Sequence, residues 1–153
     1  MAIATMTEHK NMWDVDQPKV VPERAGVTVK ELEEVLKVAP AAMPLLGTWN
    51  NIDPSTGGLV KIVLGFAAGA ITVHAFGACH PTPCDWGVVK GMTYGATVSS
   101  NQAIAFSAFY KFGFKETILT GHLLRGQLFV ETFSHFTDGS NRFDYYADEI
   151  LRR

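Results

Sequence analysis

The chain has 153 residues, of which 47% are hydrophobic and 18% are charged, and its formal net charge is −2. This length suits one domain with a core of its own, and no basic stretch favours a nucleic-acid partner. No apolar run reaches the about 18 residues of a membrane-spanning helix, so no membrane partner is expected. With 14 glycines and 10 phenylalanines, the composition favours many short strands over a helical bundle.

Residues 1–26 show no hydrophobic periodicity and contain Pro18 and Pro22, which predicts an irregular N-terminal arm. Trp13 is a candidate anchor for this arm on the folded domain or on a second subunit. The first residues include acidic side chains and lack an apolar core, so they do not resemble a secretory signal. We therefore expect a cytoplasmic protein, in which Cys79 and Cys84 are thiols.

The segment 28–38 carries the helix that the pattern predicts, at the start of a single domain over 27–153. Thr28 and Glu31 form a capping box, in which the hydroxyl and the carboxylate each accept a backbone N–H, and Pro40 ends the helix. Its apolar side chains share one face: Val29, Leu32, Val35 and Leu36. A helix this short is stable only when that face packs on another element.

From Leu45 onward the hydrophobic period changes to two, which predicts strands. The expected strands are 45–52, 59–66, 70–77, 86–90, 93–98, 103–111, 114–124, 127–136 and 142–151. The connections are short and mostly contain glycine, so consecutive strands must pair antiparallel as a meander. Closure removes the two exposed edges of a meander. The sequence thus predicts an all-β domain, an antiparallel up-and-down barrel of about eight strands.

Several predicted strands place aromatic rings and isolated polar groups on the same face, as Phe129, Glu131 and Phe133 do. This mixture is typical of a ligand cavity with apolar walls and few polar groups. An eight-stranded barrel has room for at most one small ligand. We therefore expect an apolar or aromatic ligand to contact His74, Phe76, Tyr110, Phe129, Glu131, Phe133 and Tyr146. The alternatives are a solid core and a wet outer face rich in aromatic side chains.

The segment LLGTWNNID, which opens the first expected strand, resembles the Gly-x-Trp signature of the lipocalins and the wider calycins through Gly47 and Trp49. The resemblance implies that this tryptophan packs across the closed end of a barrel. It also implies that a basic residue from near the last strand, Arg142 or Arg152, covers the indole ring. The Thr-Asp-Tyr motif and the long helix after the barrel are absent from the sequence, and avidin-like barrels share the Gly-Thr-Trp opening.

The segments HAFGACHPTPCDWG and FTDGSNRFDYY resemble a set of uncharacterised bacterial proteins that carry a Cys-His-Pro-Thr-x-Cys-Asp-Trp-Gly loop. This resemblance implies a small β domain, either free-standing or appended to another domain. It implies nothing about a substrate.

The loop 78–87 leaves several interpretations open. Cys79, His80 and Cys84 are candidate metal ligands, with His74 or Asp85 as the fourth, but their spacing is not a standard zinc spacing. A local disulfide is geometrically permitted and is disfavoured only by a reducing cytoplasm. A cysteine nucleophile paired with a histidine lacks any recognisable oxyanion hole.

The same loop also has a purely structural interpretation, which the sequence favours. The prolines shape the hairpin, Asp85 accepts backbone N–H groups, and Trp86 fills one end of the barrel. In that case the cysteines act as small hydrophobic residues, and the sequence predicts no metal.

Glu131 and His74 are the candidates for acid–base catalysis if the barrel is an enzyme. Burial between Phe129 and Phe133 would raise the pKa of Glu131 and suit it to proton transfer. His74 could serve in the same way or pair with Glu131. The alternative is an outward glutamate bridged to a neighbouring basic residue.

Three functions therefore follow from the sequence. The first is a barrel that binds a small apolar or aromatic molecule, without a cofactor. The second is a cofactor-independent cyclase or isomerase that acts on a hydrophobic molecule in the cavity. The third is a structural or interaction module with a solid core, and each of the three is compatible with a homo-oligomer.

Overall fold

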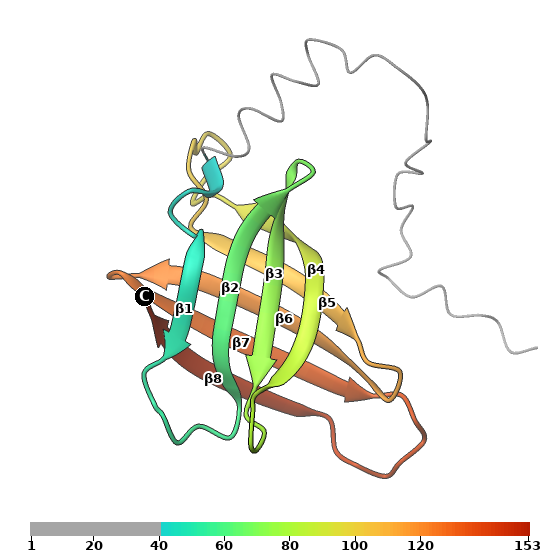
Figure 1. Cartoon of the computed structure of the whole chain (residues 1–153). Helices are drawn as coiled ribbons and strands as arrows, with labels where there is room; N and C mark the ends of the chain where they lie inside the picture. Colours follow the sequence, from blue (N-terminus) through green and yellow to red (C-terminus); the bar gives the residue numbers. More distant parts are fainter. Residues whose placement is uncertain (1–40) are drawn as a thin grey trace, which may run out of the picture.

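The computed structural model describes residues 41–153, so the expected arm 1–26 and the expected helix 28–38 lie outside the described residues. The described chain forms a closed barrel in which each strand pairs antiparallel with the next and β8 pairs with β1 (Figure 1). The strands are β1 (Gly47–Asn51), β2 (Leu59–Ala67), β3 (Ala70–Gly77), β4 (Cys84–Tyr94), β5 (Ala105–Lys111), β6 (Lys115–Leu124), β7 (Gln127–Phe136) and β8 (Tyr145–Arg152). The expected up-and-down barrel of about eight strands is confirmed.

Two tight hairpins set the register of the strand pairs β2–β3 and β6–β7. Ala68 and Gly69 join β2 to β3, and Arg125 and Gly126 join β6 to β7, all four with positive φ angles between 51° and 77°. Positive φ at both central positions is the type I′ turn, whose twist matches that of the flanking strands.

The structure corrects one expected turn. The segments 86–90 and 93–98 were expected as two strands joined at Gly91, but β4 runs unbroken through this glycine. A Cβ atom at Gly91 would lie 2.7 Å from the carbonyl oxygen of Ser107 and 3.0 Å from a methyl group of Ile71. Glycine is therefore needed here because the backbone of Ser107 and the side chain of Ile71 leave no room for a Cβ atom, and not because the chain turns.

The barrel interior is filled mainly by compact aliphatic side chains. Ile62, Leu64, Val73, Leu119 and Val130 are at most 2% exposed. The buried hydroxyls of Thr117 and Ser134 bond to each other at 2.8 Å, so this polar pair in the interior is satisfied. No helix in the described part of the chain is long and apolar enough to cross a membrane.

Trp49 packs inside the barrel beneath residues 41–46, and we call the end of the barrel at which this segment lies the closed end. Its indole N–H donates to the carbonyl of Leu45 at 2.8 Å, and the side chain is 1% exposed. The guanidinium of Arg153 lies 4.4 Å from the ring centroid and donates to the carbonyls of Pro44 and Leu46. The basic partner of the tryptophan is thus Arg153.

Neither basic residue expected over Trp49 takes that position. Arg142 bonds to Asp138 in the loop between β7 and β8 and lies over the ring of Phe136. Arg152 is the last residue of β8 and follows the buried Leu151, so it projects to the outer face and is exposed.

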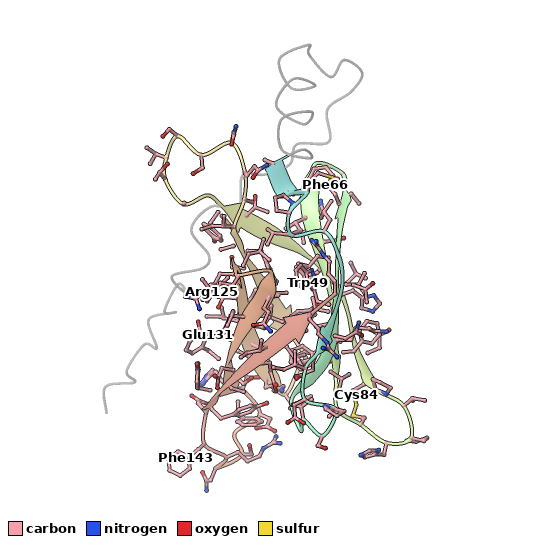
Figure 2. All side chains as sticks on the ribbon, turned by 90° about the vertical axis from the view of Figure 1, so that its left-hand side faces the viewer. Trp49, Phe66, Cys84, Arg125, Glu131 and Phe143 are labelled. Atoms are coloured by element: carbon pink, nitrogen blue, oxygen red, sulfur yellow. A yellow bond between two sulfur atoms is a disulfide. The ribbon has the colours of Figure 1, made fainter. Side chains whose placement is uncertain are left out.

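The other end of the barrel, which we call the open end, carries four of the connections between strands. They are the loops 52–58, 78–83, 112–114 and 137–144, and they lie at the bottom of Figure 1. In Figure 2, Cys84 and Phe143 mark this end, and Phe66 lies at the opposite end. The open end positions the candidate site.

Candidate functional site

A pocket of about 600 Å³ lies at the open end, between the loops and the first residues of the strands. The aromatic side chains that line it come from β4, β8 and the loop between β5 and β6. They are Trp86, Phe112, Phe114 and Tyr145. The charged lining groups are Lys115, Asp85 and Glu149.

A cluster of stacked and edge-to-face aromatic rings forms one side of the pocket and continues into the core. The ring of Phe112 lies 5.2 Å from that of Trp86, at 81°, and 5.6 Å from that of Tyr110, at 5°. Trp86 and Tyr110 also meet edge to face at 5.5 Å. Such contacts add roughly 0.5–1.5 kcal/mol per pair to the free energy of area burial, so this side of the pocket is firmly held.

Tyr110 is the expected ligand contact that does lie inside the barrel, but its hydroxyl is already occupied. The hydroxyl donates to the carbonyl of Val73 at 2.8 Å and accepts the N–H of Ala75 at 3.2 Å. Burial raises the pKa of this phenol to about 12. Tyr110 therefore supports the aromatic cluster from beneath and fixes the β3 backbone.

Lys115 begins β6 and extends into the pocket among aromatic rings. Its Nζ lies 5.3–5.9 Å from the ring centroids of Trp86, Phe112, Phe114 and Tyr145. It also donates to the hydroxyl of Tyr145 at 2.9 Å. Burial raises the pKa of Tyr145, but the hydrogen bonds from Lys115 and Ser134 outweigh burial, so this pKa lies below its usual value.

Glu149 brings a carboxylate into the pocket from β8. It pairs with Val130 across the strands, and Val130 is 1% exposed, so both side chains point inward. Its carboxylate accepts the amide of Asn51 at 2.6 Å and the hydroxyl of Thr56 at 2.8 Å. A Cβ atom at Gly58 would come within 2.0 Å of this carboxylate, so the glycine makes room for it.

Cys79 and Cys84 form a disulfide that closes the loop between β3 and β4 at the edge of the pocket (Figure 2). The expectation that both are thiols is therefore wrong. Bonded to each other, they cannot serve as the thiolate ligands of the metal interpretation, and neither is a free nucleophile. His80 lies between them in the same exposed loop.

His74 bonds to Asp85 across β3 and β4, with its Nε2 2.6 Å from the carboxylate. The backbone N–H of Gly87 and then His74 hold the pKa of Asp85 below its usual value. The partner of His74 is thus Asp85 and not Glu131. Glu131 instead accepts the hydroxyl of Tyr146 at 3.0 Å.

Six of the seven expected ligand contacts lie on the outer face of the barrel. On β3 and β7 the buried positions alternate with them: Ile71, Val73, Ala75, Leu128 and Val130. The expectation that the outer set lines the interior is wrong, and none of the seven lines the pocket. The outer set comprises His74, Phe76, Phe129, Glu131, Phe133 and Tyr146.

The outer aromatic side chains belong to a row that crosses neighbouring strands. Phe109 pairs with Ile118, Ile118 with Phe133, and Phe133 with Tyr146. Phe133 and Tyr146 are 47% and 53% exposed, with ring centroids 5.3 Å apart. Cross-strand aromatic pairing explains why rings alternate with polar groups without facing a cavity.

Sequence reasoning did not identify two charged side chains that line the pocket, those of Glu149 and Lys115. Glu149 and Asp148 are adjacent on β8 and must therefore point to opposite sides of the sheet. Leu151, two residues further on and 0% exposed, is the signal that assigns Glu149 to the inside. Lys115 lies two residues before Thr117 and four before Leu119, both 0% exposed, so alternation along β6 assigns it to the inside as well.

Within residues 41–153, no three histidine, cysteine or acidic side chains are grouped so that they could hold a metal ion. Comparisons of the chain with protein-family models, with curated proteins and with solved structures found no match.

Proposed function

We propose that this protein binds a small apolar or aromatic molecule in the pocket at the open end of the barrel. The observation that carries the proposal is the pocket of about 600 Å³ lined by Trp86, Phe112, Phe114 and Tyr145. Ligand sites commonly have volumes of about 300–1,000 Å³, largely apolar walls and a few polar groups. Lys115, Glu149 and Thr132 supply such polar groups here.

The calycin-like resemblance supports the same proposal. It implies a tryptophan covered by a basic residue from near the last strand; the guanidinium of Arg153, not that of Arg142 or Arg152, lies over the ring of Trp49. A barrel filled at one end and accessible at the other is suited to hold one molecule in its mouth.

The compartment expected from the sequence, the cytoplasm, stays a prediction. A disulfide between Cys79 and Cys84 is typical of oxidising compartments and weighs against it.

Titration with N-phenyl-1-naphthylamine, a neutral aromatic probe that fluoresces in apolar surroundings, tests the proposal. We expect saturable binding of one probe per chain. Ala147→Phe places a ring in the pocket, since Ala147 lines it, and should weaken binding at least tenfold. Ala105→Phe is the matched control, because Ala105 lies on the outer face of β5.

Two results would contradict the proposal. One is the absence of saturable binding, which a solid-core interaction module predicts. The other is equal binding by the wild-type protein and Ala147→Phe, which would place the probe outside the pocket.

Glu149 favours an isomerase or cyclase as a second candidate. Its carboxylate lies inside the pocket, whereas Glu131 and His74 do not. Donors from Asn51 and Thr56 hold it in one orientation, as proton transfer requires. Glu149→Gln should abolish turnover of a substrate if this function is correct, but should only change the affinity of a binding protein.

A further inference from the structure

We infer that the pocket selects aromatic or apolar molecules that carry an acidic group, and that Lys115 binds this group. The inference rests on the proposed function and names the ligand class of the same site. It comes from the contrast between Lys115 and the two lining carboxylates, each of which has partners within the protein.

The carboxylates of the pocket are already satisfied. Asp85 accepts the backbone N–H of Gly87 at 2.7 Å and bonds to His74. Glu149 accepts hydrogen bonds from the side chains of Asn51 and Thr56. Neither carboxylate therefore needs a cation from the ligand, and each has its charge balanced by donors or dipoles of the protein.

Lys115 differs because its ammonium meets no carboxylate within 4.0 Å in the part of the chain that the structure describes. One of its three N–H groups donates to the Tyr145 hydroxyl at 2.9 Å. The surrounding rings attract the cation electrostatically but offer no strong acceptor. Two N–H donors are therefore left for an anionic oxygen.

The aromatic rings around Lys115 indicate that the remainder of the ligand is apolar or aromatic. Trp86, Phe112 and Phe114 each lie within 6 Å of the ammonium by ring centroid. An acid bound to Lys115 thus places its remaining atoms against aromatic surface. A small inorganic anion would leave that apolar surface exposed to water, whereas an aromatic carboxylate or sulfonate buries it, which favours binding.

Two probes that differ by a single sulfonate test this selection. They are N-phenyl-1-naphthylamine, which is neutral, and 8-anilino-1-naphthalenesulfonate, its sulfonated counterpart. We expect Lys115→Met to weaken binding of the sulfonate at least tenfold more than binding of the neutral probe, because a charge-assisted hydrogen bond is lost only with the sulfonate. Lys115→Arg should keep the sulfonate preference.

Lys111→Met is the matched control, because Lys111 is an exposed lysine whose nearest acidic partner is Glu116, at 3.8 Å. It should change the affinity of neither probe by more than twofold. Salt gives a second test that needs no variant. Raising the ionic strength from 0.05 to about 0.5 M should weaken binding of the sulfonate to the wild-type protein more than binding of the neutral probe.

The outcomes separate the inference from the proposed function. If the neutral probe binds in the pocket but Lys115→Met weakens both probes equally, Lys115 only holds the rings and the inference is overturned. Equal salt dependence of the two probes overturns it as well. If neither probe binds, or Ala147→Phe leaves both affinities unchanged, the proposed function fails.

Discussion

The indole of Trp86 lies directly over Gly77, where a Cβ atom would come 2.8 Å from the indole Nε1. Both residues line the pocket, and they sit on adjacent strands, β3 and β4. The missing side chain of Gly77 therefore sets the position of the largest aromatic ring in the site.

Gly77→Ala should displace the Trp86 indole into the pocket. We expect the free energy of unfolding to fall by about 1–3 kcal/mol, as for other overpacked sites, and the affinity for N-phenyl-1-naphthylamine to fall several-fold. Urea unfolding and probe titration measure the two effects. Gly57→Ala is the control, since a Cβ there meets nothing within 4 Å; equal behaviour of the two variants would contradict the predicted role of Gly77.

Arg153→Ala should destabilise the closed end. The cation–π contact with Trp49 and the bonds to the carbonyls of Pro44 and Leu46 are lost. Because Arg153 is exposed, we expect a loss of about 1 kcal/mol in urea unfolding. Arg152→Ala, which removes the neighbouring outward side chain, should change stability by less than about 0.5 kcal/mol. An equal effect of the two substitutions would argue against the contact with Trp49.

Reduction of the Cys79–Cys84 disulfide should loosen the loop at the pocket edge. Closing a loop this short removes enough unfolded-state entropy to stabilise the fold by about 2 kcal/mol. We expect dithiothreitol to lower both the urea midpoint and the affinity for the neutral probe. The double variant Cys79→Ser/Cys84→Ser should have the urea midpoint and probe affinity of the reduced protein, and dithiothreitol should change neither. A wild-type protein with two free thiols before reduction would refute the disulfide.

The pair His135–Asp144 should make the loop between β7 and β8 sensitive to pH. The hydrogen bond that the ring of His135 donates to the Asp144 carboxylate raises the pKa of His135 above its ordinary value of 6.5 and lowers the pKa of Asp144. The stabilisation from His135 is complete below pH 6.5 and is lost as the pH rises through the raised pKa. The stabilisation from Asp144 is lost as the pH falls through its lowered pKa.

An NMR titration of the His135 ring protons measures this pKa. We expect Asp144→Asn to lower it, because the substitution removes the carboxylate that favours the charged ring. An unchanged His135 titration in Asp144→Asn would show that the two side chains do not interact in solution.

The barrel could be predicted from the sequence because its determinants are local. Strand period, glycine turns such as Arg125–Gly126 and short connections each follow from neighbouring residues. Gly91 was misread as a turn because glycine also serves close strand packing, and only the position of Ser107 on β5 distinguishes the two.

The site could be predicted only in part, because period two identifies two faces but not which of them is inside. On β7, the face of Phe129 and Phe133 is more aromatic than that of Leu128 and Val130, yet the compact aliphatic face fills the barrel. The expected position of Trp86 at one end of the barrel agrees with its place in the pocket. The contact between Lys115 and Trp86 could not be predicted, because the two residues lie on β6 and β4 and meet only in the folded barrel.

Chemical-shift mapping of 15N-labelled protein with 1-naphthol, a soluble neutral aromatic, tests most directly that the open-end pocket binds such molecules. We predict saturable shifts of the Trp86 indole N–H and of the Gly58 and Lys115 amides, with the Trp49 indole N–H unchanged at the closed end. Saturable shifts confined to the outer face, at Glu131, Phe133 and Tyr146, or no saturable shift at all, would contradict the account.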